Sequence, residues 1–258
     1  SAGLPGERAR RIALWVFGGI VGASGYFIHN YAIFGSFAPA YAYEVDPFFR
    51  EQMARGLMGA GLPRWRVVLL VTLHPFQGLL LWFPIVALAL AGCVRQMRGV
   101  RAERFEVGVA LASFVLLLLY VGGYFMWWGG WSYAPRHLIP ALPFLTVGLT
   151  PWLRGRGAAR AVLLAVGALG TIVNLSAIAV DPQVPPGLPQ EALMAPETVE
   201  QWPVPMLVLL RHFWIDGYAD TNLGTQMGLV GPWSLVPLAL IWGAMWCVLP
   251  RWVSDAPG

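Results

Sequence analysis

Charged side chains are scarce in this sequence, and lysine is absent altogether. Asp, Glu, Lys and Arg make up 12% of the 258 residues, whereas 57% are hydrophobic. A soluble domain usually carries about 25% charged residues, so the charge here is too sparse to cover a globular surface. The 17 basic residues are all arginines, scattered near predicted helix ends without forming a stripe. This pattern argues against binding to DNA or RNA.

Cysteine is also rare. Cys93 and Cys247 both lie in apolar surroundings, and without a cluster of Cys and His the sequence predicts neither a disulfide nor a metal site. The polar, basic stretch from Ser1 to Arg11 is typical of the lead-in to a membrane span and unlike a cleavable signal peptide. We expect residues 1–258 to form one transmembrane domain, the C-terminal part of a longer protein.

Long apolar runs take the place of the missing charge. Six of them approach the length of about 20 residues that crosses a bilayer as a helix, so we predict an all-α, polytopic transmembrane helix bundle. The predicted spans are Ile12–His29, Gly78–Val94, Val107–Met126, Leu138–Leu153, Ala158–Val180 and Gly231–Leu249. Three shorter segments are predicted to be interfacial helices or half-helices: Pro47–Leu57, Val67–Leu73 and Met206–Ile215.

Arginine placement predicts the orientation of these spans. With the N-terminus in the cytoplasm, 11 of the 17 arginines fall in the inner loops and tails, and most acidic residues fall outside. Because positively charged loops stay on the cytoplasmic side, this distribution supports six spans in this orientation. All four histidines then lie on or near the extracytoplasmic side, where we expect any chemistry to take place.

Two outer segments carry polar residues that could form a site. Glu44 and Asp46 could act as base and metal ligand or bind a sugar, although a solvated turn before the interfacial helix is the simpler interpretation. Further on, Pro75 interrupts any helix, so His74 and Gln77 sit on irregular backbone at the membrane edge. Such backbone lines a wet cavity or forms a plain re-entrant turn.

The stretch WWGGWSYAPRHLIP is unusually aromatic for a loop. Gly129 and Gly130 permit a tight turn or a close approach of the backbone. An aromatic belt at headgroup level accounts for the four aromatic residues of the stretch, which are Trp127, Trp128, Trp131 and Tyr133.

The belt does not account for the two residues that follow. Arg136 and His137 abut a short, proline-containing span, so they are expected near lipid phosphates. An arginine binds phosphate with a fixed bidentate fork, Tyr133 or His137 can add a hydrogen bond, and a sugar or prenyl chain can pack on Trp128 or Trp131. The alternative is that Arg136 is only a snorkelling anchor.

The last outer segment is proline-rich and then apolar. Arg211, His212, Asp216 and Asp220 follow one another on and after its short predicted helix. Acceptor recognition is one interpretation, and a packed cap over the outer face is the other.

Four segments resemble a known family when they are taken together. GGWSYAPRHLIPALPFL, NYAIFGS, HPFQGLLLWFPIVALAL and NLGTQMGLVGPWSLVPLAL are similar to stretches of bacterial GT-C-type polytopic glycosyltransferases, the relatives of dolichyl-phosphate-mannose protein mannosyltransferases. They occur in the family's order. Two residues depart from its pattern, because Ala134 stands where Gly is frequent and His137 where Tyr is common.

The resemblance implies transfer of a sugar from a polyprenyl-phosphate donor on the extracytoplasmic side of a bacterial cytoplasmic membrane. It covers the family's C-terminal part, and it implies that the catalytic carboxylate lies upstream, which leaves Glu44 and Asp46 as the only catalytic candidates here. This part is expected to bind the lipid phosphate through Arg136, with no metal or other cofactor assigned.

Two alternatives come from other classes. A lipid or solute transporter needs polar or charged groups in mid-membrane, but the predicted spans are almost free of charge, with Asn174 as the notable polar residue. A non-catalytic membrane subunit, with membrane lipids as its main partners, also fits the sequence.

Overall fold

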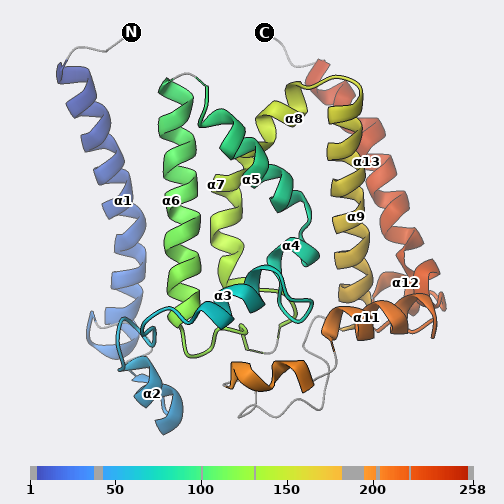
Figure 1. The fold of residues 1–258 in the computed structure, drawn as a ribbon, viewed down its shortest axis with the longest axis horizontal. Helices are drawn as coiled ribbons and strands as arrows, with labels where there is room; N and C mark the ends of the chain where they lie inside the picture. The colour runs from blue at the N-terminus through green and yellow to red at the C-terminus, as the bar shows by residue number, and fades with distance from the viewer. Residues whose placement is uncertain are drawn as a thin grey trace. The chain divides into compact units, whose positions relative to one another are not determined.

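The computed structural model describes residues 5–37, 43–99, 101–130, 132–181, 195–201, 204–220 and 222–254. The regular elements in these ranges are helices (Figure 1), which confirms the predicted all-α class. Contacts divide the chain into two compact units, Ser1–Gly59 and Ala60–Gly258.

The first unit contains a long helix and a short one. Helix α1 (Pro5–Phe34) includes the first predicted span, and α2 (Pro47–Met53) follows the next described turn. Asp46 caps α2, because its side chain accepts a hydrogen bond from the backbone N–H of Phe48 at 2.8 Å. The predicted interfacial helix therefore begins at Pro47 as expected but ends before Leu57, where the backbone of Gly56 and Met58 turns to positive φ.

The second unit begins with two helices, α3 and α4, that are separated at Pro75, where the sequence predicts a break. Helix α3 ends at Thr72, and the turn at Pro75 separates it from α4. A side chain at Gly78 would overlap the backbone carbonyl of His74, so only glycine fits this turn. The elements here are α3 (Trp65–Thr72), α4 (Leu79–Trp82), α5 (Ile85–Gln96) and α6 (Arg101–Gly123).

The fourth predicted span is a chain of short helical pieces. Its prolines lack the N–H that a continuous α-helix needs, so 3-10 and α turns alternate through η2 (Arg136–Ala141), α7 (Leu142–Leu145), η3 (Thr146–Leu149) and α8 (Thr150–Arg154). The remaining elements are α9 (Ala158–Val180), η4 (Pro196–Gln201), α11 (Pro205–Trp214), α12 (Leu223–Gln226), η5 (Gly231–Leu235) and α13 (Val236–Ser254).

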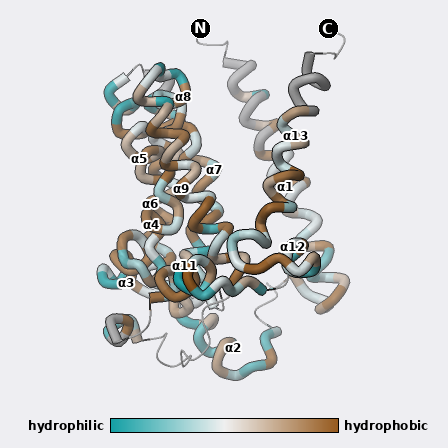
Figure 2. The backbone as a smooth tube through the Cα atoms, turned by 90° about the vertical axis from the view of Figure 1, so that its right-hand side faces the viewer, coloured by the Kyte–Doolittle hydropathy of each residue, from teal (hydrophilic) through white to brown (hydrophobic). Residues whose placement is uncertain are grey.

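The second unit has two distinct ends. The arginine-rich loops between α5 and α6 and between α8 and α9 lie at one end, and α3, α11 and α12 lie at the other (Figure 1). Hydrophilic residues gather toward both ends of this unit, with apolar residues between them (Figure 2). The fold thus separates the loops predicted to be cytoplasmic from the segments predicted to be extracytoplasmic.

Within the described residues, two helices are long and apolar enough to cross a bilayer, Arg104–Gly123 and Ala158–Val180. In the most apolar 18-residue stretch of each helix, only 28% and 22% of the residues are buried. The core helix of a soluble protein is mostly buried. Large apolar side chains such as Leu116, Leu164 and Leu240 are more than 60% exposed. Exposed apolar surface on this scale favours contact with another apolar phase over water.

Glycines allow α5 to contact η3 at backbone distance. A Cβ atom at Gly92 would overlap the carbonyl oxygen of Gly148, and one at Gly148 would overlap that of Ala89. Two side-chain hydrogen bonds fix the same contact, from Trp152 to the carbonyl of Leu88 at 2.9 Å and from Gln96 to that of Val147 at 3.0 Å.

The Gly92→Ala substitution is expected to lower stability by roughly 1–3 kcal/mol, because the added methyl group forces the two backbones apart. Gly108→Ala in α6 is the matched control, since nothing lies within 4 Å of its added Cβ and alanine stabilises a helix by about 0.5–1 kcal/mol over glycine. Thermal unfolding of both purified variants measures the difference, and equal melting temperatures would contradict the close contact.

Candidate functional site

The loop between α6 and η2 folds inward onto the core. Trp127 and Trp128 are 0% and 2% exposed and belong to the main hydrophobic cluster with residues of α3, α5 and α6. They therefore do not form an exposed aromatic belt, because their rings pack against protein. A ligand has no open face of Trp128 to stack on in this conformation, and Trp131 lies outside the described residues.

Arg136 lies over the double-glycine turn of this loop. Gly129 and Gly130 have φ of +84° and +70°, and a Cβ atom at either would come within about 3 Å of the Arg136 side chain. Arg136 itself is exposed. In the part of the chain that the structure describes, its guanidinium makes no hydrogen bond or ion pair, so its donors are available to an anion.

His137 points into the protein and is kept neutral. Burial and the neighbouring Arg136 lower the pKa of His137, although its hydrogen bond to the backbone of Met126 opposes the shift. Its Nε2 atom is buried without a hydrogen-bond partner, and its ring meets that of Tyr124 edge-on at 5.3 Å. The structure therefore orients His137 away from the exposed position of Arg136.

Tyr133 packs on the ring of Trp82, with the two ring centroids 4.6 Å apart. Burial raises the pKa of Tyr133 to about 12, so its hydroxyl stays protonated and can donate a hydrogen bond but cannot act as a base at neutral pH. The next residue, Ala134, has φ of +60°, a left-handed conformation that glycine adopts more readily. This is the position where the family resemblance has glycine.

The structure brings the turn that carries His74 and Gln77 into contact with the loop that precedes Arg136. Gln77 is fully buried, and its Nε2 donates to the backbone carbonyl of Ser132 at 3.3 Å, while its Oε1 has no partner. His74 accepts a hydrogen bond from the backbone N–H of Phe76 through Nδ1 at 3.2 Å. Both residues thus support the turn and the loop beside it.

The carboxylates of the first unit stabilise local backbone. Asp46 caps α2, and Glu44 accepts from the backbone N–H of Asp46 at 3.1 Å. Capping accounts for both residues without any catalytic role.

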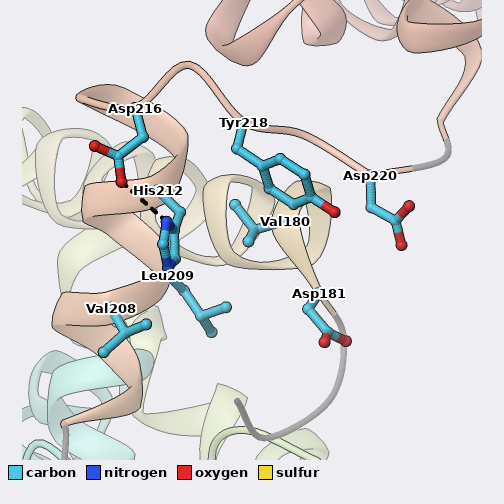
Figure 3. Close-up of a pocket in the computed structure, with 8 residues that line it drawn as sticks. All are labelled: Val180, Asp181, Val208, Leu209, His212, Asp216, Tyr218 and Asp220. Carbon is cyan, nitrogen blue, oxygen red and sulfur yellow. Dashed lines mark hydrogen bonds and ion pairs between the residues drawn. The ribbon is translucent and has the colours of Figure 1, made fainter. Parts of the chain in front are cut away.

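A cavity of about 510 Å³ opens between α9, α11 and the segment after α11 (Figure 3). Its size falls within the range of roughly 300–1,000 Å³ that is usual for small-molecule sites. Apolar and ionisable side chains share the lining, which consists of Val180, Asp181, Val208, Leu209, His212, Asp216, Tyr218 and Asp220.

His212 and Asp216 form a hydrogen-bonded pair in this cavity, with 2.9 Å between Nδ1 and Oδ2. An ionised carboxylate can only accept, so Nδ1 donates in this pair, and in the neutral ring Nε2 is then an acceptor. Arg211 lies 3.9 Å from the same carboxylate oxygen. The spacing of four residues places His212 and Asp216 on one helix face and is the signal by which the sequence alone could identify the pair.

Asp181 and Tyr218 are absent from the sequence-based candidates. They reach the cavity because the segment after α11 turns back along the end of α9, where the N–H of Asp220 donates to the carbonyl of Ala179 at 2.7 Å. No local sequence pattern reports this contact between distant segments.

The cavity adjoins the loop that carries Arg136. Val180 and Leu209 line the cavity and also belong to the buried cluster that contains Ala134, against which Tyr133 packs. The cavity wall and the loop are therefore parts of one packed layer at the same end of the unit.

Comparisons of this chain with protein-family models, with curated proteins and with solved structures find no match. Within the described ranges, no group of three or more His, Cys, Asp or Glu side chains could hold a metal ion.

Partly buried His137 is expected to make the fold sensitive to acid. Because its folded-state pKa is lowered, the unfolded chain binds the proton more readily, so stability is retained above the ordinary histidine value of about 6.5 and is lost as the pH falls below it. His137→Gln should shrink the drop in melting temperature between about pH 7.5 and pH 5.5. The exposed His29, changed in the same way, should leave that drop unaltered; an equal effect of both variants would contradict the assignment.

Gly129→Ala is expected to destabilise the protein by about 1–2 kcal/mol, because a left-handed conformation is costly for alanine and the new Cβ would press on Arg136 at 3.0 Å. The control is Gly61→Ala, where nothing lies within 4 Å. Thermal unfolding reports the difference, and a Gly129 variant as stable as the control would show that the turn adapts.

Proposed function

We propose that this chain is part of an integral-membrane glycosyltransferase and that it binds the phosphate of a polyprenyl-phosphate sugar donor. Transfer would take place on the extracytoplasmic side of a bacterial cytoplasmic membrane. The observation that carries the proposal is the exposed Arg136 guanidinium, which lies over a glycine-dependent turn and makes no ion pair with any described residue.

Arg136 suits a phosphate ligand better than it suits an anchor. Its guanidinium presents paired N–H donors to a phosphate, and the packing of Trp127 and Trp128 restrains the loop beneath it. Donors that are held in place before the reaction stabilise developing charge on a leaving phosphate without having to reorganise.

Tyr133 keeps its expected role as a hydrogen-bond donor to the phosphate. His137 is assigned a structural role in place of the phosphate contact that the sequence predicted. The Tyr133 hydroxyl, with its pKa raised to about 12, remains a hydrogen-bond donor throughout the physiological range. The buried, neutral His137 adds no charge beside Arg136, and we assign it to positioning the loop. Trp128 is assigned to the same supporting role because its ring is buried.

A lipid-linked donor requires a membrane location, which the apolar helices support. The two candidate spans expose most of their apolar surface, and the polar loops of the second unit lie at its two ends. Under the arginine rule, the end with α3 and α11 is extracytoplasmic, and the loop before Arg136 begins at the end of α6 on that side. Six spans in total remain part of this proposal.

Arg136→Ala is expected to lower kcat/KM for the sugar donor by roughly 100-fold. This is the usual effect of removing one hydrogen-bond donor from a site that stabilises developing charge. Arg136→Lys should recover part of the activity, because it keeps the charge but loses the bidentate geometry. The assay uses the whole enzyme of which this chain is part. It measures sugar transfer from radiolabelled polyprenyl-phosphate-linked hexoses, offered singly, to a membrane extract that supplies acceptors.

The matched control is Arg160→Ala, which removes an exposed arginine at the start of α9 and should leave transfer unchanged. Wild-type transfer by the Arg136→Ala protein would remove Arg136 from the mechanism.

A further inference from the structure

The cavity between α9 and α11 has two chemically different walls. Val180, Val208 and Leu209 form an apolar wall, while the carboxylates of Asp181 and Asp220 lie toward one end (Figure 3). The hydrogen-bonded pair of His212 and Asp216 occupies the other end, with the half-exposed ring of Tyr218 between the two ends (Figure 3).

The polar lining consists mainly of hydrogen-bond acceptors. Each ionised carboxylate offers about four lone-pair sites and no donor, so Asp181 and Asp220 can accept from a ligand in addition to their existing contacts. His212 in its neutral form adds another acceptor, because Nδ1 is engaged with Asp216 and Nε2 makes no other hydrogen bond among the described residues. A ligand that matches this lining must present several O–H or N–H donors.

The electrostatic field in the cavity is negative. Three carboxylates line the cavity, and Arg211 lies 3.9 Å from one of them, that of Asp216. The C-terminal turns of α9 and α11 also end at the cavity, and helix C-termini carry partial negative charge. Anionic ligands are therefore repelled, while neutral or cationic ones are accepted.

We propose that this cavity binds the acceptor of the transfer reaction, a neutral or amine-bearing polyol of monosaccharide size. The acceptor's hydroxyl groups would donate to Asp181, Asp220 and His212, and its C–H face would pack on the apolar wall and on Tyr218. Asp216 is a positioning residue that fixes the tautomer of His212. The assignment rests on the proposed function, since it supplies the second substrate for the donor that Arg136 binds.

Direct binding tests the cavity without any donor. The probes are methyl α-mannopyranoside, glucosamine and glucuronate, which are neutral, cationic and anionic, and binding to the detergent-purified full chain is followed by saturation-transfer NMR and calorimetry. The first two should bind saturably, and glucuronate at least about tenfold more weakly. His212→Ala and Asp220→Asn should each weaken binding of the mannoside roughly 10- to 100-fold, because each removes a hydrogen bond to a charged or strongly accepting group.

Asp220→Asn is nearly isosteric, so it keeps the test valid if His212→Ala fails to fold. Asp181→Asn combined with Asp220→Asn should relax the discrimination against glucuronate, an effect that a loss of folding could not produce. His29→Ala, which removes an exposed histidine of the first unit, should leave all three affinities unchanged. Equal binding of glucuronate and the mannoside, or mannoside binding that survives both cavity variants, would overturn the proposal.

Transfer kinetics separate this inference from the proposed function. With mannoside as acceptor, Asp220→Asn should raise the acceptor KM at least about tenfold with the donor KM unchanged, and Arg136→Ala should affect the donor instead. If Arg136→Ala loses transfer but the wild-type protein does not bind the mannoside, the acceptor site alone is refuted. Mannoside binding by a wild-type protein that does not bind the polyprenyl-phosphate sugar would refute the proposed function, and the acceptor assignment with it.

Discussion

Burial of Trp127 and Trp128 is the constraint on which the candidate donor site depends. The two indoles lie within the core formed by α3, α5, α6 and the loop itself, and burying such large apolar groups is strongly favourable. To place them there the chain must reverse immediately afterwards, which requires the positive φ angles of Gly129 and Gly130. That reversal puts Arg136 over the glycines and leaves it exposed.

The same layer connects the two halves of the proposed reaction. Gln77 joins the turn before α4 to the loop through the carbonyl of Ser132, and Trp82 of α4 packs on Tyr133. Trp82 also belongs to the cluster that includes the cavity-lining residues Val180 and Leu209. Donor and acceptor sites built in this way share one scaffold, so a change in one wall is transmitted through packed side chains to the other.

Local sequence patterns predicted the positions of helices better than they predicted the roles of individual side chains. Pro75 and Gly78 correctly break the helix between α3 and α4, because their constraints are local. The aromatic belt did not hold for Trp127 and Trp128, since composition does not distinguish an indole that faces lipid from one that faces the core. Glu44 and Asp46 are two nearby carboxylates in the sequence, and in the structure Asp46 caps α2 while Glu44 accepts from the backbone N–H of Asp46.

The sequence by itself determined the all-α class, the helix-breaking positions and the polar residues that line each outer segment. Hydrophobic periodicity, proline and glycine constrain the backbone over only a few residues, so their effects can be recognised in the sequence alone. Only the tertiary structure decided that the Nε2 atom of His137 is buried while Arg136 is exposed, and that Asp181, Tyr218 and Asp220 line one cavity. Those outcomes depend on which distant helices pack together, because burial and electrostatic environment are properties of neighbours in space.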